Sequence, residues 1–317
     1  MVRSLLVAVL LLAGPVLAAA QYPDRPVTAI CGYPAGGLAD VVLRAVVEGM
    51  KRKFPKGIAV VNRPGAGGAI GTAEITLAKP DGYTFGLAPL STVVIHPQLN
   101  ELPYRTPNDY APFINVVSYY PLLAVNWDTP WKTAEELFAA AKASPGKLRV
   151  GTPGEGTSSH LNLEELKRLT GADLNHVPFA GWAESSTALL GGHIEAVVAQ
   201  PADVKPQLEA KRMRILGMFQ PQRSPYFPDV PTFKELGYDV ADGVWFLLVA
   251  PKATPPDTLK YLHDAAKGAI DSAAFASFVK SRAIEADYRP MEKLRADLWR
   301  EYRAHTDILQ RLGMLKK

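Results

Sequence analysis

Short apolar runs alternate with amphipathic segments along most of the chain. Residues 27–31 have the pattern of a buried strand, and residues 40–50 repeat apolar positions at helical spacing. Gly36 and Gly37 lie between these two segments. A second unit of strand, glycine turn and helix spans residues 148–171, although the two units share no sequence repeat. The pattern predicts two similar halves more than a hundred residues apart.

Further segments continue the alternation. Strands are predicted at residues 58–61, 84–87, 193–199, 215–219 and 245–250, and helices at 134–143, 257–271 and 291–312. Thr133 with Glu136, and Thr232 with Glu235, are capping boxes, and the second predicts a short helix that ends at Gly237. The alternation predicts an α/β fold of parallel sheets with helices on both faces. Ligands of such sheets bind beyond the carboxyl ends of the strands, so we expect the two glycine turns to face one cleft.

The first twenty residues have a different pattern. Arg3 precedes an apolar run at residues 5–12, and Ala18, Ala19 and Ala20 supply small residues before Gln21. This pattern predicts a signal peptide, residues 1–20, cleaved after Ala20, and therefore export to the periplasm. No later run approaches the about 18 apolar residues of a spanning helix, so the mature protein is expected to be soluble.

Composition narrows the function classes. The chain has 317 residues, of which 48% are hydrophobic and 21% charged, with a net charge of +4. That charge is dispersed, and the longest basic block, residues 51–53, lacks interleaved aromatic residues, which argues against nucleic-acid binding. The single cysteine, Cys31, excludes an intramolecular disulfide and is expected to be a small buried residue.

Metal and nucleotide cofactors are not expected. The six histidines include no H-x-x-x-H pair. The loop Asn62–Gly71 begins like a dinucleotide fingerprint, but Ile70 stands where the third glycine belongs. We interpret this loop as a structural glycine turn and predict no cofactor.

Two loops carry the candidate chemistry. In YPAGGLAD (33–40), the glycines let the backbone approach a ligand, and the following helix presents free N–H groups, with Asp40 expected at the N-cap. A tight turn without a ligand is the alternative. In GTPGEGTSSH (151–160), the hydroxyls of Thr152, Thr157 and Ser158 can donate to a carboxylate. Ser158 or Ser159 with a histidine also allows a secreted serine hydrolase, although neither serine has a G-x-S-x-G surrounding.

These stretches together resemble one family. AKPDGYTF (78–85), VNRPGAGGAIGT (61–72), GTSSHL (156–161) and HVPFAGWAESSTALLGGHIEAV (176–197) are similar to segments of the extracytoplasmic solute receptors of the tripartite tricarboxylate transporter system, the Bug receptors. The resemblance implies a type II periplasmic binding protein without enzymatic activity. Lobe 1 would combine residues 22–125 with 246–317, and lobe 2 would hold residues 126–245.

The resemblance also implies a carboxylate ligand, held by backbone amides, hydroxyls and waters without an arginine. A large and a small membrane subunit would be the partners of a monomeric receptor; a receptor that feeds a signalling system is the alternative. Tyr33, Ala39 and Trp182 stand where Phe, Thr and a small residue are common, and Gln200 offers an amide. The pocket should therefore be more aromatic and less charged than is common in this family. It should fit a dicarboxylate or an aromatic carboxylate rather than citrate.

The expected ligand-binding residues are Tyr33, Gly36, Gly37, Leu38, Ala39, Asp40, Pro89, Leu90, Thr152, Gly156, Thr157, Ser158, His160, Phe179, Ala180, Trp182, Gln200 and Trp245.

Overall fold

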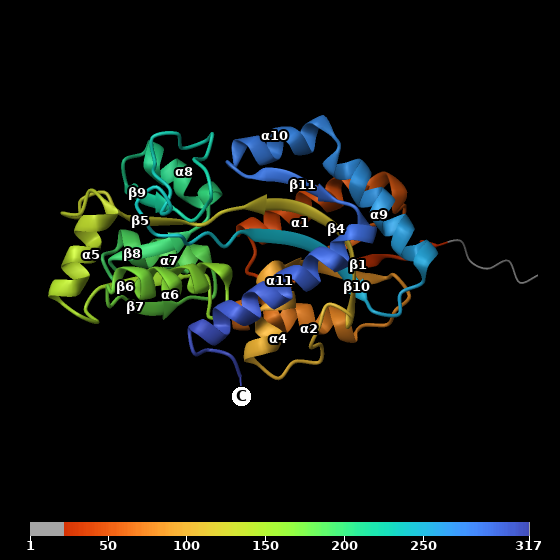
Figure 1. Cartoon of the computed structure of the whole chain (residues 1–317). Helices are drawn as coiled ribbons and strands as arrows, with labels where there is room; N and C mark the ends of the chain where they lie inside the picture. Colours follow the sequence, from red (N-terminus) through yellow and green to blue (C-terminus); the bar gives the residue numbers. More distant parts are fainter. Residues whose placement is uncertain (1–21, 317) are drawn as a thin grey trace, which may run out of the picture.

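Two α/β lobes lie side by side, each built on one sheet (Figure 1). The structure, a computed structural model, describes residues 22–316; the predicted signal peptide lies outside these residues. The six strands of the first sheet are, in spatial order, β11 (Glu285–Arg289), β4 (Tyr110–Tyr119), β10 (Val244–Pro251), β3 (Thr84–Pro89), β1 (Val27–Cys31) and β2 (Ile58–Asn62). The five strands of the second sheet are β7 (Asn175–Pro178), β6 (Arg149–Thr152), β8 (Ala196–Ala199), β5 (Leu122–Asn126) and β9 (Met213–Met218).

Helices cover both faces of each sheet, because each covering helix packs one apolar face against a core. On the first sheet, one face packs against α1 (Leu38–Met50), α9 (Pro256–Ile270) and α10 (Ala273–Ser281). The other face packs against α2 (Ala69–Leu77), α3 (Leu90–Val94) and α11 (Met291–Arg311). On the second sheet, α5 (Ala134–Ala143) and α6 (Ser158–Thr170) cover one face, and α7 (Trp182–Leu190) and α8 (Pro201–Glu209) the other. The short helices are η1 (Lys51–Lys53), η2 (Ala66–Gly68) and α4 (His96–Leu99).

The prediction of all-parallel sheets is wrong. Strand β1 pairs in parallel with β2 and β3, and β6 with β7 and β8, as expected. Strand β10, however, is antiparallel to β3 and β4, and β5 is antiparallel to β8 and β9. Parallel neighbours need a helical crossover. Strand β4 instead continues into β5 after residues 120–121 alone, so the chain passes straight from one sheet to the other.

Several predicted elements differ in length or type. Thr232 and Glu235 form both capping-box hydrogen bonds, at 2.9 and 3.1 Å, yet residues 233–237 form a turn instead of a helix. Gly237, with φ of 88°, follows too soon for a second helical turn. Strand β8 begins at Ala196, three residues later than predicted. The helix predicted at 134–143 has those bounds, and its capping box is present.

The predicted lobe boundaries stay a prediction. Among the described strands, the chain leaves the first sheet after Tyr119 and returns to it at Val244.

Cys31 is fully buried in β1, and burial raises the pKa of its thiol to about 11. Across residues 22–316, no helix combines the length and the apolar character that crossing a membrane requires.

The second connection between the lobes, residues 219–243, is fixed to both of them. His305 of α11 lies 3.1 Å from the Asp242 carboxylate through Nε2, and its Nδ1 lies 2.8 Å from the Glu301 carbonyl oxygen. The backbone N–H of Asp242 donates to Asn162 of α6 at 3.0 Å, and the Asn162 amide donates back to the Asp242 carbonyl at 2.9 Å. Helix α11 thus reaches from the first lobe to α6 of the second (Figure 1).

The two lobes also contact each other where Gly67 of the first lobe lies against Gly154 and Glu155 of the second. A Cβ built on Gly154 would lie 3.0 Å from the Cα of Gly67, and one built on Gly67 would lie 2.9 Å from the Glu155 carbonyl oxygen. Gly67 belongs to the loop that the sequence suggested to be a structural turn. Its carbonyl also accepts a hydrogen bond from the Tyr33 hydroxyl at 2.7 Å. This loop therefore brings the two lobes together beside the cleft.

Candidate functional site

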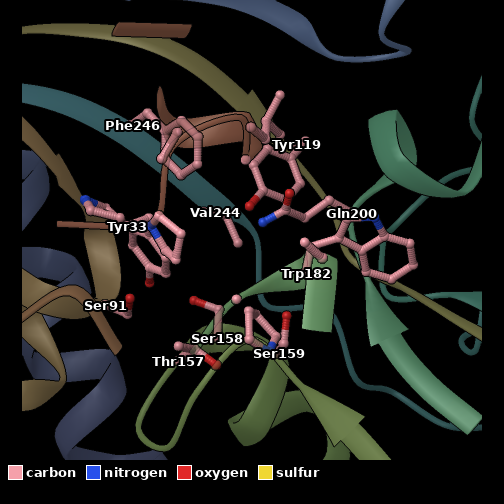
Figure 2. A pocket seen from close by; sticks show the side chains of 18 of the residues that line it. Tyr33, Ser91, Tyr119, Thr157, Ser158, Ser159, Trp182, Gln200, Val244 and Phe246 are labelled. Atoms are coloured by element: carbon pink, nitrogen blue, oxygen red, sulfur yellow. The ribbon is translucent and has the colours of Figure 1, made fainter. Parts of the chain in front are cut away.

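A cavity of about 110 Å³ lies between the two lobes (Figure 2). At ~10–15 Å³ per water, this volume holds roughly ten heavy atoms, the size of a small organic acid. Its walls come from the loops that follow β1, β6 and β8, from the junction of β3 and α3, from the end of β4, and from the starts of β10 and α7. The lining residues are Tyr33, Pro34, Ala35, Gly37, Leu38, Ala39, Pro89, Ser91, Tyr119, Pro153, Thr157, Ser158, Ser159, Gly181, Trp182, Ala183, Glu184, Gln200, Val244 and Phe246.

The first glycine turn presents the start of α1 to the cavity. The N-cap is Gly37 rather than Asp40, so the predicted capping role of Asp40 is wrong. The Asp40 carboxylate accepts hydrogen bonds from the Gly36 N–H at 2.9 Å, the Asn62 amide at 2.9 Å and Arg44 Nε at 3.0 Å. Burial opposes ionisation of Asp40, but these donors outweigh it and hold the pKa of its carboxyl below the usual value. Arg44 is thereby neutralised locally, and Gly37, Leu38 and Ala39 at the start of α1 line the cavity.

The second glycine turn presents the start of α6. Thr157 is its N-cap; the hydroxyl accepts from the His160 N–H at 3.3 Å and donates to the Gly154 carbonyl at 2.8 Å. The expected donation from Thr157 to a ligand is therefore not available in this arrangement. Ser158 is 1% exposed, and its hydroxyl has no hydrogen-bond partner among the described residues. Figure 2 shows the Ser158 and Ser159 hydroxyls on the cavity side of the loop.

Two stacked histidines support this loop from behind. The Gly156 N–H donates to His160 Nδ1 at 3.1 Å, and the rings of His160 and His176 stack with centroids 3.9 Å apart. His176 Nε2 lies 2.7 Å from the Thr152 hydroxyl. Burial lowers the pKa of His160 to about 4 and of His176 to about 3, so both are neutral near pH 7. Thr152, Gly156 and His160 thus shape the loop without lining the cavity.

Ser158 and His160 are not arranged as a nucleophile and its base. His160 Nδ1 is engaged by the Gly156 N–H, and its Nε2 faces Glu164 at 3.8 Å. In the described part of the chain no hydrogen bond joins Ser158 to a histidine. A nucleophile needs a base within about 2.6–3.2 Å, so this geometry does not favour the hydrolase alternative.

The opposite wall is aromatic and carries one amide. Tyr33, Tyr119 and Phe246 border it together with Trp182 and Gln200 (Figure 2). Gln200 Oε1 is buried and lacks a hydrogen-bond partner within residues 22–316. Among the described lining residues, one side chain, that of Glu184, is charged. No group of three His, Cys, Asp or Glu side chains that could hold a metal ion occurs in the described residues.

Strand alternation places Trp245 away from the cavity. Val244 and Phe246 line it, and successive side chains of a strand point to opposite faces. Trp245 packs on the far face of β10, with the Arg289 guanidinium carbon 3.5 Å from its ring centroid. Phe246, the neighbour of the predicted Trp245, is therefore the aromatic residue of β10 that lines the cavity.

Half of the expected ligand-binding residues line the cavity. They are Tyr33, Gly37, Leu38, Ala39, Pro89, Thr157, Ser158, Trp182 and Gln200. The other nine residues lie outside the lining set. They are Gly36 before α1, Asp40 in its first turn, Leu90 in the core, Thr152, Gly156 and His160 behind the α6 loop, Phe179 and Ala180 before α7, and Trp245 on the far face of β10. Ligand contact by any of these residues stays a prediction.

Sequence reasoning missed Tyr119, Ser91, Glu184, Val244 and Phe246 among the lining residues. Tyr119 ends the long apolar run of β4, which offered a signal because strand ends border the clefts of α/β proteins. Strand β10 is apolar and buried along its whole length, so the sequence carried no signal that favoured Phe246 over Trp245. Ser91 and Glu184 sit one or two residues inside helices and carried no comparable signal.

The cavity is enclosed between two α/β lobes that two connections join, and helix starts border it. This arrangement defines a solute receptor of the periplasmic binding protein class. The model of the tripartite tricarboxylate transporter family receptor matches residues 42–313. The chain belongs to this family.

Individual relatives agree with this assignment. A protein of Cupriavidus necator, described as a UPF0065 protein in the gbd 5' region, is 36% identical over 302 residues, covering 93% of this chain and 90% of the relative. The solved periplasmic binding protein BugD is 27% identical with a TM-score of 0.87, over 93% of this chain and 100% of BugD. MatC of Rhodopseudomonas palustris, solved with bound malate, is 26% identical with a TM-score of 0.85, over 91% of this chain and 100% of MatC.

Proposed function

We propose that this protein captures a small carboxylate in the periplasm, with a dicarboxylate or an aromatic carboxylate as the favoured ligand, and delivers it to the large and small membrane subunits of a tripartite transporter. One observation carries the proposal. The starts of α1 and α6 border one cavity, where the buried Ser158 hydroxyl lacks a partner among the described residues and the lining residues include no cation.

These groups suit a carboxylate without an ion pair. Helix starts offer free N–H groups and a positive dipole end, which favour an anion. Hydrogen bonds to a charged acceptor contribute about 1.5–3 kcal/mol each, and a micromolar Kd corresponds to about 8 kcal/mol. Four such bonds therefore suffice. The bound malate of MatC supports a carboxylate as the ligand class.

Capture requires the lobes to open and close. A hinge at residues 120–121 and at 241–243, between Val240 of the second-lobe core and the start of β10, would admit the acid and then bury it between the two helix starts. Closure changes the surface that both lobes present together, which a membrane partner can recognise. The same motion would serve a signalling partner; loss of uptake of the identified acid in a strain lacking the receptor would favour transport.

We expect small organic acids to bind with micromolar Kd in titration calorimetry, and one present at a hundred times its Kd to raise the unfolding free energy by about 2.7 kcal/mol. Ser158→Ala should weaken this binding by about tenfold, because one charged hydrogen bond is lost. Ser281→Ala, at an exposed site on α10, is the matched control. Absence of binding by every acid in a broad panel, or release of a hydrolysis product from an ester, would contradict the proposal.

A further inference from the structure

We propose that His96 is an acid-sensitive switch between the lobes: the lobes must part before His96 takes up a proton, so acid favours the open receptor and release of the ligand. The inference goes beyond ligand capture to the regulation of capture. It rests on the proposed function in one step, since it assumes that the closed receptor is the form that holds the ligand.

His96 lies at the contact between the two lobes. It is the first residue of α4 in the first lobe, and it is 3% exposed. A Cβ built on Gly67 would lie 2.9 Å from His96 Nε2, and one built on Gly156 of the second lobe would lie 3.2 Å from the same atom. The edge of the imidazole that carries Nε2 is therefore enclosed between a glycine of each lobe.

The ring nitrogens of His96 are both buried, and neither has a hydrogen-bond partner within residues 22–316. A neutral imidazole carries one donor and one acceptor, whereas an imidazolium carries two donors and a positive charge. A proton added to the enclosed ring would therefore create a buried charge whose N–H groups are unpaired. Burying an unpaired charge is costly, so the closed arrangement accepts only the neutral ring.

A crevice beside the ring gives water a route to it once the lobes move. The crevice has a volume of about 370 Å³, and its walls include His96, Leu99 and Asn100 of the first lobe and Glu155 and Gly156 of the second. Since Gly156 belongs to the second lobe, separation of the lobes removes one of the two covers of Nε2 and opens this atom to the crevice. A hydrated ring regains an ordinary histidine pKa of about 6.5.

Burial, rather than a neighbouring charge, controls the proton affinity of His96, and it lowers the pKa of the ring to about 4. From the second lobe, Glu155 borders the same crevice with an exposed side chain, and His160 lies close enough for His96 to contribute to its lowered pKa. Helix α11 packs on α4 through Tyr302 and Thr306, which are uncharged at neutral and acidic pH. Separation of the lobes is therefore the change that raises the pKa of His96.

Two further acidic groups near these contacts have to be considered. Glu101, beyond α4, is paired with Lys316 at 2.8 Å. Asp203 of α8 is buried in the second lobe, which raises its pKa to about 7, and Arg282 of the first lobe offsets this rise only in part. If opening hydrates Asp203, this residue acts in the opposite sense, because acid then favours the closed form through it. The test must therefore isolate the contribution of His96.

The closed receptor holds fewer protons on His96 than the open one. The pKa of the ring is about 4 when it is enclosed and about 6.5 when it is hydrated. Above about pH 6.5 the ring is neutral in both forms and the switch has no effect. Between about pH 6.5 and about pH 4, each pH unit weakens closure by up to about tenfold. At about pH 5.5 the contribution of His96 is thus an about tenfold loss of ligand affinity.

Calorimetry of the wild type and His96→Gln at about pH 7.5 and about pH 5.5 tests the proposal. The probes are malate, adipate, benzoate and 4-hydroxybenzoate, and the acid that binds most tightly at the higher pH is used at both. From the higher to the lower pH, the Kd of the wild type should rise about tenfold more than that of His96→Gln, which has no proton to gain. This comparison cancels the titration of the ligand and of Asp203. His193→Gln, at an exposed site, should respond like the wild type.

NMR titration of the histidines measures the same equilibrium in the wild type, so the test does not depend on a variant that folds. The His96 signal, assigned through the backbone resonances, should titrate near about pH 6.5 without ligand and below about pH 5 with saturating ligand. The same titration in both states, or equal pH responses of the wild type and a folded His96→Gln, overturns the inference and leaves the proposed function intact. Failure of every acid to bind at the higher pH overturns the proposed function, and this inference with it.

Discussion

Gly67→Ala is expected to weaken ligand binding by about 10- to 100-fold, as the 1–3 kcal/mol cost of overpacking implies. A Cβ at this position would lie 2.9 Å from the Glu155 carbonyl oxygen on the other lobe and 2.9 Å from His96 Nε2. The backbone oxygen cannot rotate away, so the lobes would have to separate. Calorimetry gives the affinity, and small-angle X-ray scattering with saturating ligand should show a larger radius of gyration than the wild type.

Gly57→Ala is the matched control for this variant. Gly67 and Gly57 have φ of 58° and 85°, so alanine is strained at both, but nothing lies within 4 Å of a Cβ on Gly57. Both variants should lose a similar amount of stability without ligand, and Gly67→Ala alone should lose affinity. Equal affinities of the two variants would show that this glycine contact does not limit closure.

The free energy of unfolding is expected to fall by about 3 kcal/mol as the pH rises from about 6.5 to above 9. Burial alone would lower the pKa of His305, but the Asp242 carboxylate and the Glu301 carbonyl oxygen outweigh it and raise the pKa to about 9. The folded pKa exceeds the unfolded value of about 6.5, so this stabilisation is complete below pH 6.5 and is lost as the pH rises through 9. Urea unfolding at several pH values measures this fall in the free energy of unfolding.

His305→Gln should remove most of this decline, because glutamine carries no proton to lose. His193→Gln changes an exposed histidine and should keep the wild-type profile. His96, His160 and His176 have lowered pKa values, so they influence stability on the acid side and leave the alkaline decline unchanged. Identical pH profiles of the wild type and His305→Gln would refute the role of the Asp242 pair.

The sequence predicted those parts of the fold that depend on local chemistry. The capping box at Thr133 fixed the start of α5, and the glycine at 171, with φ of 68°, ended α6 as expected. The glycines at 36–37 and at 154–156 correctly marked two turns that open onto one cavity. These features depend on backbone conformations that few residue types can adopt.

Long-range features could not be predicted in this way. Strand β4 is buried on both faces, so its apolar run lacks the alternation that distinguishes a strand from a helix. The partners of Asp40 include Asn62, 22 positions away, and no local pattern indicates such a contact. Trp245 and Phe246 are equally apolar, and only the register of β10 against β3 and β4 decides which of them reaches the cavity.

The fully buried thiol in β1 makes the protein suitable for a fluorescent sensor. Cys31 is the single cysteine of the chain, and its raised pKa keeps the reactive thiolate scarce near neutral pH. A dye that reacts with thiols would therefore label a cysteine introduced on the surface of either lobe, with the native thiol left in place. Two such labels, one per lobe, would report ligand-driven changes in interlobe distance through energy transfer.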